Sequence, residues 1–506
     1  MIALAQLAPE ASTVPDMQVQ GVALDSRRVT QGSLFIALRG QTSDGHDFID
    51  AAVAQGATAV FAERPVAHCQ VPLVVVADLA ARVSHIAGEF FGHPSHQFDC
   101  VAVTGTNGKT SVAHFTAMLA AQLGMQAGFM GTTGWGFVSA QDKAARNKPL
   151  ALAPATLTTA DAVSLQERLL ELRSNGVELV ALELSSHALH QYRGAALGVD
   201  IALFTNLSRD HLDYHGSMEH YGAAKARLFQ FPCLRGMALN VDDAFGAELL
   251  TKLEPGNPDK PVLGLVADSV PSNAQQNSLR ISNLTSSSEG MSWRLSSPWG
   301  EVELRSQVIG RYNAVNITLA VAALALLGHS LAAIAAAVPA LLAPAGRLQR
   351  VGHSPSVFVD YAHTPDALAT VLRAARAHCT GQLICVFGCG GDRDPGKRGP
   401  MGQAVANYAD IGWLTSDNPR FEDPAAIIAE VHAGLADNPA MRNKIRTELD
   451  RRAAITQAIA AAGADDLVII AGKGHEDYQD IKGERHPFDD ALVARAALVA
   501  RSEGAR

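Results

Sequence analysis

The sequence predicts an α/β protein of three domains built on parallel sheets. Its 506 residues exceed what a single hydrophobic core usually organises. The short apolar run Cys100–Thr104 leads through a glycine-rich turn into a helix with apolar periodicity, which is the strand, loop and helix arrangement of a phosphate-binding unit. From residue 343 onward, strand-like runs alternate with helical segments. We expect the three domains to span residues 1–97, 98–342 and 343–506.

The composition predicts a globular chain that handles neither nucleic acid nor membranes. Hydrophobic residues make up 48% and charged residues 18% of the chain. The net charge of −9, with no block of Lys and Arg, argues against a nucleic-acid partner. The six cysteines contain no C-x-x-C pair, so neither a disulfide framework nor a zinc site is indicated. Residues 1–16 lack the features of a signal peptide, so we expect a cytoplasmic location without membrane insertion.

The first domain should combine short strands with short helices. Apolar runs of four to six residues predict strands at Leu34–Leu38, Ala57–Ala62 and Leu73–Val76. Helices are predicted at Asp47–Gln55 and Asp78–Phe91, and the break Gly92–Ser95 predicts the first linker.

The central domain is predicted to hold a parallel sheet. Val177–Glu183 and Val199–Thr205 are nearly continuous apolar runs, as expected of strands buried on both faces. Residues 265–305 are richer in Ser, Asn and Gln and predict an antiparallel excursion. The apolar stretch that follows is broken by a Gly-His-Ser sequence at residues 328–330, so Asn313–Leu342 predicts two packed helices rather than a membrane span.

The third domain should begin after a linker at Ala343–Arg347. Strands are predicted at Val357–Asp360, Leu383–Phe387, Ile411–Thr415 and Leu467–Ala471, with helices between them. This pattern is typical of a doubly wound sheet, whose sites lie at the carboxyl ends of the strands.

The loop Gly105–Thr110, with sequence GTNGKT, predicts a site for a nucleoside triphosphate. Its backbone N–H groups and the helix dipole would face a phosphate, and Lys109 adds a positive charge. Thr110 is placed to offer its hydroxyl to Mg²⁺. The usual spacing would require a glycine at Val103, so this is a shorter form of the motif.

Three residues near the predicted central strands have a function that the pattern alone leaves open. Glu183 ends a strand and suits either a Mg²⁺ ligand or a surface carboxylate. His211 alone favours a hydrogen-bonding role, because magnesium rarely takes imidazole. Lys225 lies on a predicted helix, where a lysine is usually solvated.

Polar and glycine residues follow every predicted strand of the third domain. Arg393 and Arg420 offer planar forks suited to a carboxylate, and Glu476 offers the opposite charge. Together these loops predict a site for a zwitterionic amino acid. The four loops are residues 360–365, 388–394, 417–420 and 472–476.

Taken together and in this order, the motifs resemble the Mur ligase family, the ATP-dependent amide ligases that build the peptide stem of peptidoglycan. The matching pieces are GTNGKT, the segment around Glu183, NLSRDHLDYHG, GRYNAVN, Gly346-Arg347 and DYAHTP, so the resemblance covers essentially the whole chain. It implies an N-terminal UDP-sugar domain, a central P-loop ATPase domain and a C-terminal Rossmann-like domain. The sequence DNPR at residues 417–420 resembles the members that add meso-2,6-diaminopimelate to UDP-N-acetylmuramoyl-L-alanyl-D-glutamate.

The resemblance also implies site residues. The ATP residues would be Gly105, Thr106, Asn107, Gly108, Lys109, Thr110, Ser111, Asn313, Arg347 and Asp360. The UDP-sugar-peptide residues would be Leu24, Ser26, Gln41, Thr42, Ser43, Thr158, Thr159, Ser185, Gln191 and Arg193. The diaminopimelate residues would be Arg393, Asp417, Asn418, Pro419, Arg420, Gly472 and Glu476. The catalytic residues would be Lys109, Glu183, His211 and Lys225. Mg²⁺ would be held by Thr110, Glu183, His211 and Lys225, the last carbamylated by CO₂.

The implied reaction passes through an acyl phosphate, and the implied enzyme is a cytoplasmic monomer whose third domain closes over the central one. Where the family often has asparagine before its Thr-Thr pair, this chain has Leu157, which puts one polar contact to the sugar-peptide substrate in doubt. The alternatives are a lysine-adding or folylpolyglutamate-type ligase and, in another class, a nucleotide-gated regulatory protein. The sequence DNPR argues against a lysine-adding ligase. The N-terminal segment LDSRRVTQGSLFIALRG argues against a folylpolyglutamate-type ligase. A regulatory protein is disfavoured by the presence together of Lys109, Glu183, His211 and Lys225.

Overall fold

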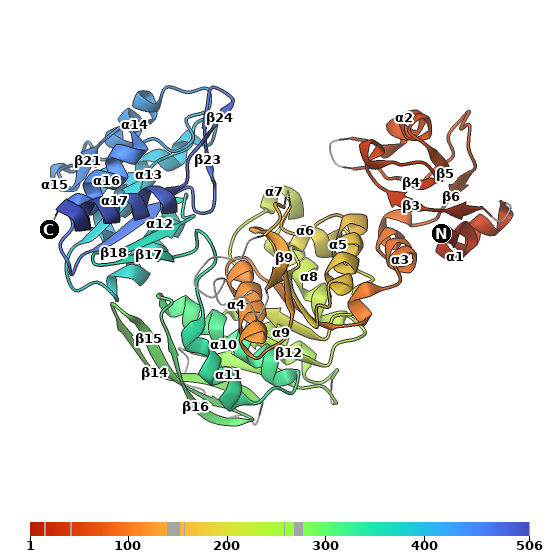
Figure 1. The fold of residues 1–506 in the computed structure, drawn as a ribbon, viewed down its shortest axis with the longest axis horizontal. Coiled ribbons are helices and arrows are strands. Elements are labelled where there is room, and N and C mark those ends of the chain that lie inside the picture. Colours follow the sequence, from red (N-terminus) through yellow and green to blue (C-terminus); the bar gives the residue numbers. More distant parts are fainter. Residues whose placement is uncertain are drawn as a thin grey trace. The chain divides into compact units, whose positions relative to one another are not determined.

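The structure is a computed structural model that describes residues 1–14, 17–40, 43–138, 152–155, 157–257, 259–267 and 277–504. The chain forms two compact units, and Figure 1 labels the helices and strands that build them. Among the described residues, the first unit comprises 1–138, 152–279 and 319–330, and the second comprises 280–318 and 331–504, with the gaps just given. Within the described ranges, no helix is long and apolar enough to cross a membrane. All six cysteines are free thiols.

A four-stranded parallel sheet forms the N-terminal part of the first unit, in the order β3-β4-β5-β6. Phe35 and Val60 pack on one face and Leu34 and Phe61 on the other, which is why these strands are apolar without alternation. The predicted strands and helices are confirmed, with bounds shifted by at most two residues. The elements are β1 (Ile2–Ala3), α1 (Leu4–Leu7), β2 (Gln18–Val19), β3 (Gly21–Ala23), β4 (Ser33–Ala37), α2 (Ile49–Ala54), β5 (Ala57–Ala62), β6 (Leu73–Val75) and α3 (Leu79–Phe91).

The central sheet of the first unit has the strand order β13-β12-β11-β7-β10-β8-β9. Its strands are parallel except β9, which pairs antiparallel with β8. β7 lies between β10 and β11, so the loop that follows it leaves from the middle of the sheet, with β10 and β11 ending on either side. The strands are β7 (Asp99–Thr104), β8 (Ala127–Gly131), β9 (Gly134–Val138), β10 (Leu179–Glu183), β11 (Ile201–Phe204), β12 (Gly236–Asn240) and β13 (Val262–Val266). The helices are α4 (Lys109–Gln122), α5 (Ala162–Ser174), α6 (Ser186–His190), α7 (Leu212–His215), α8 (Met218–Ala226) and α9 (Ala244–Leu253).

The predicted antiparallel excursion is confirmed in the part of it that the structure describes. Strands β14 (Ser278–Ser287), β15 (Gly290–Ser297) and β16 (Gly300–Ser306) form a meander. Residues 268–276, which the prediction also covered, lie outside the described residues. The two predicted helices follow as α10 (Arg311–Leu326) and α11 (Leu331–Ala337).

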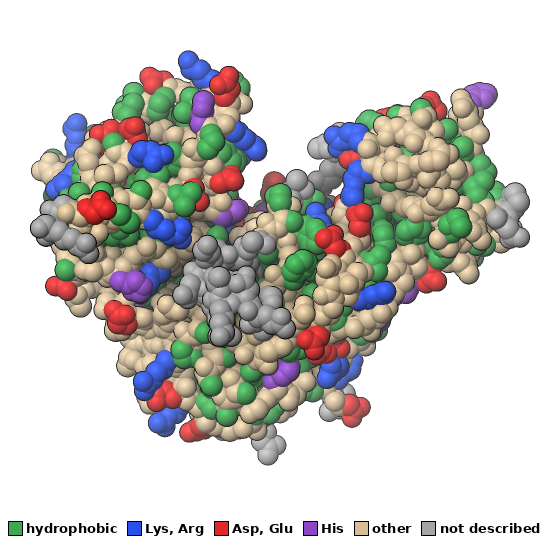
Figure 2. All heavy atoms as spheres, viewed as in Figure 1, with side chains coloured by type: hydrophobic (Ala, Val, Ile, Leu, Met, Phe, Trp, Pro, Cys, Tyr) green, Lys and Arg blue, Asp and Glu red, His purple; other side chains and the backbone are tan. Residues whose placement is uncertain are grey.

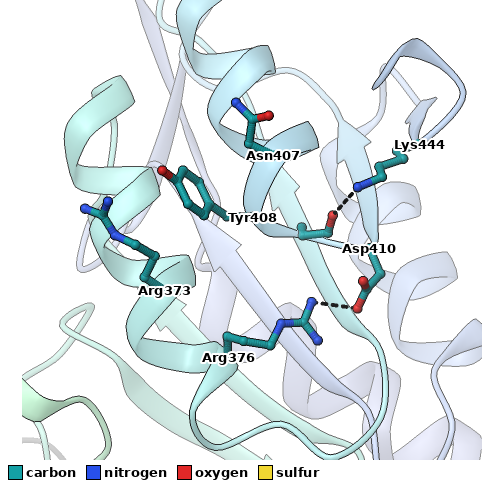
Figure 3. A pocket seen from close by; sticks show the side chains of 7 residues that line it. Arg373, Arg376, Asn407, Tyr408, Asp410 and Lys444 are labelled. Carbon is teal, nitrogen blue, oxygen red and sulfur yellow. Dashed lines mark hydrogen bonds and ion pairs between the residues drawn. The ribbon is translucent and has the colours of Figure 1, made fainter. Parts of the chain in front are cut away.

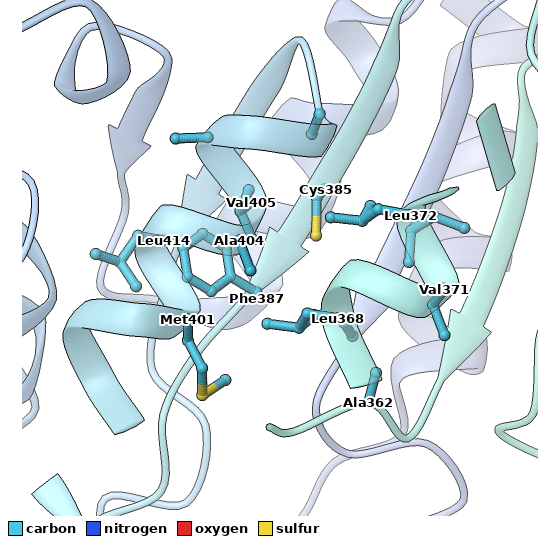
Figure 4. Close-up of a cluster of buried hydrophobic side chains, with 14 of the residues drawn as sticks. Ala362, Leu368, Val371, Leu372, Cys385, Phe387, Met401, Ala404, Val405 and Leu414 are labelled. Atoms are coloured by element: carbon cyan, nitrogen blue, oxygen red, sulfur yellow. The ribbon is translucent and has the colours of Figure 1, made fainter. Parts of the chain in front are cut away.

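The sheet of the second unit has the order β17-β18-β22-β19-β20-β21, parallel except for β17. Helices α12 and α13 cover one face, where Leu368, Phe387 and Val405 interlock (Figure 4). The other face packs against α16 and α17 through Val359 and Ile455. The strands are β17 (Gln349–His353), β18 (Ser356–Asp360), β19 (Leu383–Phe387), β20 (Ile411–Leu414), β21 (Ile445–Thr447), β22 (Leu467–Ala471), β23 (Tyr478–Ile481) and β24 (Glu484–Pro487). The helices are α12 (Pro365–Arg376), α13 (Arg398–Tyr408), α14 (Pro424–Ala433), α15 (Pro439–Arg442), α16 (Arg451–Ala461) and α17 (Asp490–Gly504).

The predicted α/β class is therefore confirmed. The domain boundaries that we placed after residues 97 and 342 remain predictions.

Candidate active site

The glycine-rich loop between β7 and α4 has the backbone expected of a phosphate-binding turn. Gly105 has φ +149° and Gly108 has φ +89°, conformations that side chains with a Cβ rarely adopt. A Cβ on Gly105 would also collide with the Thr205 hydroxyl. Glycine is therefore required twice, and α4 begins at Lys109 directly after the second of them.

Two residues at the end of β11 hold this loop in place. The Thr205 hydroxyl donates to the carbonyl oxygen of Asn107 at 2.6 Å. The backbone N–H of Asn107 donates to the Asn206 side chain at 2.9 Å, and that of Thr106 donates to the Asn206 carbonyl at 2.8 Å. The loop is thus fixed from a neighbouring strand, and sequence reasoning missed both supporting residues.

The side-chain nitrogens of two lysines meet at one carbonyl oxygen of this loop. Lys109 Nζ lies 3.0 Å from the Gly105 carbonyl oxygen, and Lys225 Nζ, from α8, lies 2.6 Å from the same atom. Lys225 is 1% exposed. Burial, reinforced by the neighbouring positive charge of Lys109, lowers the pKa of Lys225 to about 6. The solvated helical lysine that composition favours is therefore wrong, and its burial favours the unprotonated amine.

Tyr221 links the phosphate loop to Lys225. Its ring centroid lies 4.3 Å from Lys225 Nζ, and its hydroxyl lies 3.1 Å from the Thr106 hydroxyl. Tyr221 is one helical turn before Lys225 on α8. That spacing is a signal which sequence reasoning could have used.

Glu183 ends β10 as a buried carboxylate. It is 1% exposed, so the surface reading that the sequence left open is wrong. The backbone N–H of Thr132 donates to Oε1 at 2.8 Å, and the Thr132 hydroxyl donates to Oε2 at 3.3 Å. A Cβ on Gly131 would collide with Oε1, so glycine there makes room for the carboxylate. The hydrogen bonds to the Glu183 carboxylate thus come from Thr132 in the part of the chain that the structure describes, and a carboxylate so held suits a cation ligand.

The remaining predicted metal ligands are less tightly gathered. The His211 side chain is 47% exposed, and its Nε2 lies 3.6 Å from Asp210 Oδ2. Thr110 is buried in the first turn of α4. In the part of the chain that the structure describes, no three His, Cys, Asp or Glu side chains form a metal-binding group. The Thr110 hydroxyl and the Glu183 carboxylate are nevertheless the oxygen donors that Mg²⁺ prefers.

The predicted sugar-peptide residues of the central sheet lie together at the end of β10. Thr159 donates its hydroxyl to the Glu183 carbonyl oxygen at 2.7 Å and accepts from the Ser185 N–H at 3.0 Å. Arg193 donates to the Thr159 carbonyl at 3.0 Å and, through Nε and Nη2, to Gln191 Oε1.

Thr158 borders this cluster, whereas the remaining predicted sugar-peptide residues lie in the N-terminal part of the unit or outside the described residues. The Thr158 hydroxyl accepts a bond from the Thr132 hydroxyl at 3.1 Å, and Leu157 is 48% exposed. Leu24, Ser26 and Ser43 lie in the N-terminal part of the unit, whereas Gln41 and Thr42 lie outside the described residues.

In the second unit, the predicted amino-acid residues gather at the carboxyl ends of β19, β20 and β22. Asn418 Nδ2 donates to Glu476 Oε2 at 2.8 Å. Arg420 donates through Nη1 to the Gly391 carbonyl at 2.6 Å. A Cβ on Gly390 would lie 3.1 Å from Arg420 Nη1 and 3.8 Å from Arg393 Cγ, so both predicted arginines lie beside the same glycine.

Strand β23 and the turn that follows it hold the backbone of the DNPR loop. The Arg420 N–H donates to the Asp480 carbonyl at 3.0 Å, and the Lys482 N–H donates to the Arg420 carbonyl at 2.7 Å. Gln479 Nε2 donates to the Asp417 carbonyl at 2.7 Å. Arg420 has φ +49°, so these bonds stabilise a left-handed conformation that a non-glycine residue adopts at a cost. The sequence did not reveal this hairpin.

Three further nucleotide candidates lie in the second unit. Asp360 is buried and accepts from the N–H groups of Leu348 and Ala362, each at 2.8 Å. Burial raises the pKa of Asp360, and the charge of Arg347 opposes that rise. The Arg347 guanidinium carbon lies 4.9 Å from the Tyr361 ring centroid. Asn313 is also buried, and its amide donates to the Ile309 carbonyl at 2.8 Å.

The opposite, amino-terminal edge of this sheet holds a cavity of about 410 Å³ that contains none of the predicted residues (Figure 3). Its cations are engaged by the protein itself. Arg376 pairs with Asp410 at 2.7 Å, Arg373 lies over the Tyr408 ring, and Lys444 donates to the Ala409 carbonyl. On the face drawn in Figure 2, acidic and basic side chains are interspersed rather than gathered into a basic stripe.

Comparison with known proteins identifies three family segments along the chain. Residues 18–91 match the catalytic domain of the Mur ligase family, residues 103–324 the Mur ligase middle domain, and residues 346–474 the Mur ligase glutamate ligase domain.

Two full-length relatives are both named UDP-N-acetylmuramoyl-L-alanyl-D-glutamate–2,6-diaminopimelate ligase. The protein of Ectopseudomonas mendocina is 44% identical over 503 residues, covering 98% of each chain. That of Pseudomonas aeruginosa is 44% identical over 505 residues, covering 99% of this chain and 98% of the relative. A solved structure with the same protein name is 36% identical, covers 99% of both chains and superposes with a TM-score of 0.75.

Proposed function

The chain belongs to the Mur ligase family, and we propose from that premise that it joins meso-2,6-diaminopimelate to UDP-N-acetylmuramoyl-L-alanyl-D-glutamate at the expense of ATP. The family that the motifs suggested is thereby confirmed. The observation that carries the choice of substrate is the loop at residues 417–420, which holds the cation Arg420 and, through Asn418, is bonded to the carboxylate of Glu476. Opposite charges at one edge of a sheet suit an amino-acid zwitterion.

The chemistry must activate a carboxylate, because oxide cannot leave when an amine attacks. The γ-phosphoryl group of ATP passes to the D-glutamyl γ-carboxylate, which forms an acyl phosphate and releases ADP. The free amine of diaminopimelate then attacks the acyl carbon. Phosphate leaves with the bonding pair, and the amine loses a proton as the amide forms.

The phosphate loop contributes positioning and charge. Its backbone, fixed by Thr205 and Asn206, would cradle the phosphates without reorganising during the reaction. Lys109 would exchange its bonds to loop carbonyls for bonds to phosphate oxygens. Bound Mg²⁺ supplies further neutralisation of the transferring group, and Thr110 and Glu183 are the residues that would hold it.

Lys225 is proposed to carry a carbamate. A neutral amine attacks CO₂, forming an N–C bond and releasing a proton, and the product is an anionic oxygen ligand. The lowered pKa of Lys225 supports this step, because only the unprotonated amine can react. His211, one element earlier in the chain, is proposed to assist the same metal.

The remaining assignments also stand as proposals. Asn313, Arg347 and Asp360 would contribute to the nucleotide site. The residues proposed to bind the UDP-sugar dipeptide are Leu24, Ser26, Gln41, Thr42, Ser43, Thr158, Thr159, Ser185, Gln191 and Arg193. The residues proposed to bind diaminopimelate are Arg393, Asp417, Asn418, Pro419, Arg420, Gly472 and Glu476. A cytoplasmic monomer and domain boundaries after residues 97 and 342 belong to the same proposal.

The test is an amino-acid panel in which phosphate release is measured with and without the UDP-dipeptide. We expect release to require both the UDP-dipeptide and meso-diaminopimelate, with the tripeptide nucleotide identified by mass spectrometry. L-Lysine and L-glutamate serve as the matched amino acids that the two rival ligases would use. Hydrolysis of ATP that ignores both substrates would instead favour a regulatory nucleotide switch.

A further inference from the structure

Lys473 lies buried behind the amino-acid site, and the reaction as described gives it no role. It follows β22 in the sequence GKGHE and is 0% exposed. Burying an ammonium group is costly unless it is paired and hydrogen-bonded, so its environment must supply partners. Those partners are two residues of the proposed diaminopimelate site.

The ammonium group of Lys473 joins Asn418 to Glu476. Its Nζ lies 3.0 Å from Asn418 Oδ1 and 3.3 Å from Glu476 Oε2, and 5.4 Å from the Tyr478 ring centroid. Asn418 Nδ2 completes the triangle by donating to Glu476 Oε2. Three polar side chains from two different loops therefore form one closed network.

This network determines which polar atoms remain for a ligand. Asn418 Oδ1 accepts from Lys473 and from the Asp480 N–H at 2.9 Å, so the amide cannot rotate without losing both bonds. Glu476 Oε2 accepts from Asn418 and Lys473. Its Oε1 takes part in no hydrogen bond found among the described residues, so this oxygen can accept from an ammonium group of the substrate.

We propose that Lys473 is a positioning residue for the amino-acid substrate, which fixes the Asn418 amide and turns Glu476 Oε1 toward a substrate ammonium group. The inference rests on the proposed function, since it assumes that Asn418 and Glu476 contact the incoming amino acid. Lys473 itself acts through these two residues and does not contact the reacting atoms.

The experiment compares Lys473→Met with the matched control Lys444→Met in the full-length enzyme. Lys444 also donates its amine to protein oxygens, the carbonyls of Ala406 and Ala409, but at the opposite edge of the sheet. We expect Lys473→Met to raise the KM for diaminopimelate about tenfold or more, as for the loss of a charge-assisted contact. The KM values for ATP and the UDP-dipeptide should stay unchanged, as should all constants of the control.

Two more variants test the assignment if Lys473→Met is unstable. Lys473→Arg keeps the charge and can donate to both oxygens, so its KM for diaminopimelate should lie between those of wild type and Lys473→Met. Combining Lys473→Met with Asn418→Ala should raise this KM little more than Asn418→Ala alone, because the lysine acts through that amide.

The outcomes separate this inference from the proposed function. A wild-type enzyme that forms no tripeptide nucleotide refutes the proposed function. A wild-type enzyme that forms it, with an unchanged diaminopimelate KM in Lys473→Met, refutes the positioning role alone. The same refutation follows if Lys473→Met raises the KM for all three substrates equally.

Discussion

At the scale of single residues, Lys225 makes the stability of the protein depend on pH. Its folded-state pKa of about 6 lies below the value near 10.5 of a free lysine. Between these values the unfolded chain binds one proton more than the folded chain, so the free energy of unfolding should rise with pH. The stability penalty is complete below pH 6 and disappears above pH 10.5.

We therefore predict that Lys225→Met stabilises the protein at pH 7 and that this gain shrinks toward pH 10. The difference between wild type and variant should change by up to about 1.4 kcal/mol per pH unit. Denaturant unfolding in CO₂-free buffer measures it, since carbamylation would otherwise compete. A difference that is constant from pH 6.5 to 9.5 contradicts the buried, neutral amine.

Arg420 should determine the choice between diaminopimelate and lysine. Arg420 Nη1 donates to the Gly391 carbonyl, and this bond places the guanidinium group beside Gly390. Losing a bidentate contact to the distal carboxylate costs about 2–4 kcal/mol, so Arg420→Ala should lower kcat/KM for diaminopimelate more than tenfold. Turnover with lysine, which lacks that carboxylate, should change far less. Equal losses of kcat/KM with both amino acids would show that Arg420 does not recognise the distal carboxylate.

Gly131 offers a test of the metal role of Glu183. Gly131→Ala places a methyl group where Glu183 Oε1 now lies, so the carboxylate must move. We expect the Mg²⁺ concentration for half-maximal activity to rise severalfold while the KM for diaminopimelate is unchanged. Gly256→Ala is the control, because the nearest atom to its added Cβ is 3.8 Å away. An unchanged Mg²⁺ requirement would remove Glu183 from the metal site.

At the scale of elements, α16 and α17 are joined by a fully buried ion pair. Arg451 and Asp490 are both 0% exposed in their side chains and 2.6 Å apart, and Arg451 also donates to the Ala471 carbonyl beside the amino-acid loop. Asp490→Asn leaves a buried charge without compensation and should cost about 3–5 kcal/mol of the unfolding free energy of the second unit. Asp410→Asn removes an Arg–Asp pair that is about 40% exposed and should cost about 1 kcal/mol or less. Chemical denaturation compares the two variants. Similar losses of unfolding free energy in both would contradict the stabilising role of the buried pair.

The sequence predicted the elements that are apolar without interruption and missed those held by backbone pairing. β5, β19 and β22 match their predicted bounds, because strands buried on both faces carry their signal in every residue. The hairpin β23–β24 buries none of its residues fully, and Glu484–Pro487 is exposed throughout, so no continuous apolar run marks it. Its pairing with Arg420 arises only from tertiary contact.

The candidate site also contains some residues that the sequence predicted and others that it did not. Glycines and charged residues at strand ends could be found because their chemistry is local to a motif, as in Gly105–Thr110. The residues that fix those groups come from elsewhere: Thr132 holds Glu183, Tyr221 faces Lys225, and Asn206 holds the phosphate loop. Such partners are set by the meeting of distant segments, which a single sequence does not encode in any local pattern.

At the scale of the whole molecule, the two compact units have separate hydrophobic cores, so unfolding should not be a single two-state transition. The described residues that we propose to bind the UDP-dipeptide all lie in the first unit. Ligand at 100 times its Kd should therefore raise the unfolding free energy of that unit by about 2.7 kcal/mol and leave the second unchanged. Hydrogen exchange in denaturant, followed by mass spectrometry, measures the stability of each unit separately. Equal protection of peptides from both units would contradict this independence.

The backbone bonds between Arg420 and β23 have a consequence for anyone who wishes to re-engineer this ligase toward another diamino acid. Exchanging the side chain at position 420 alone leaves the new residue in a left-handed backbone shaped by the hairpin, where most side chains are strained. The recognition loop and its hairpin would have to be transplanted together, as one cassette.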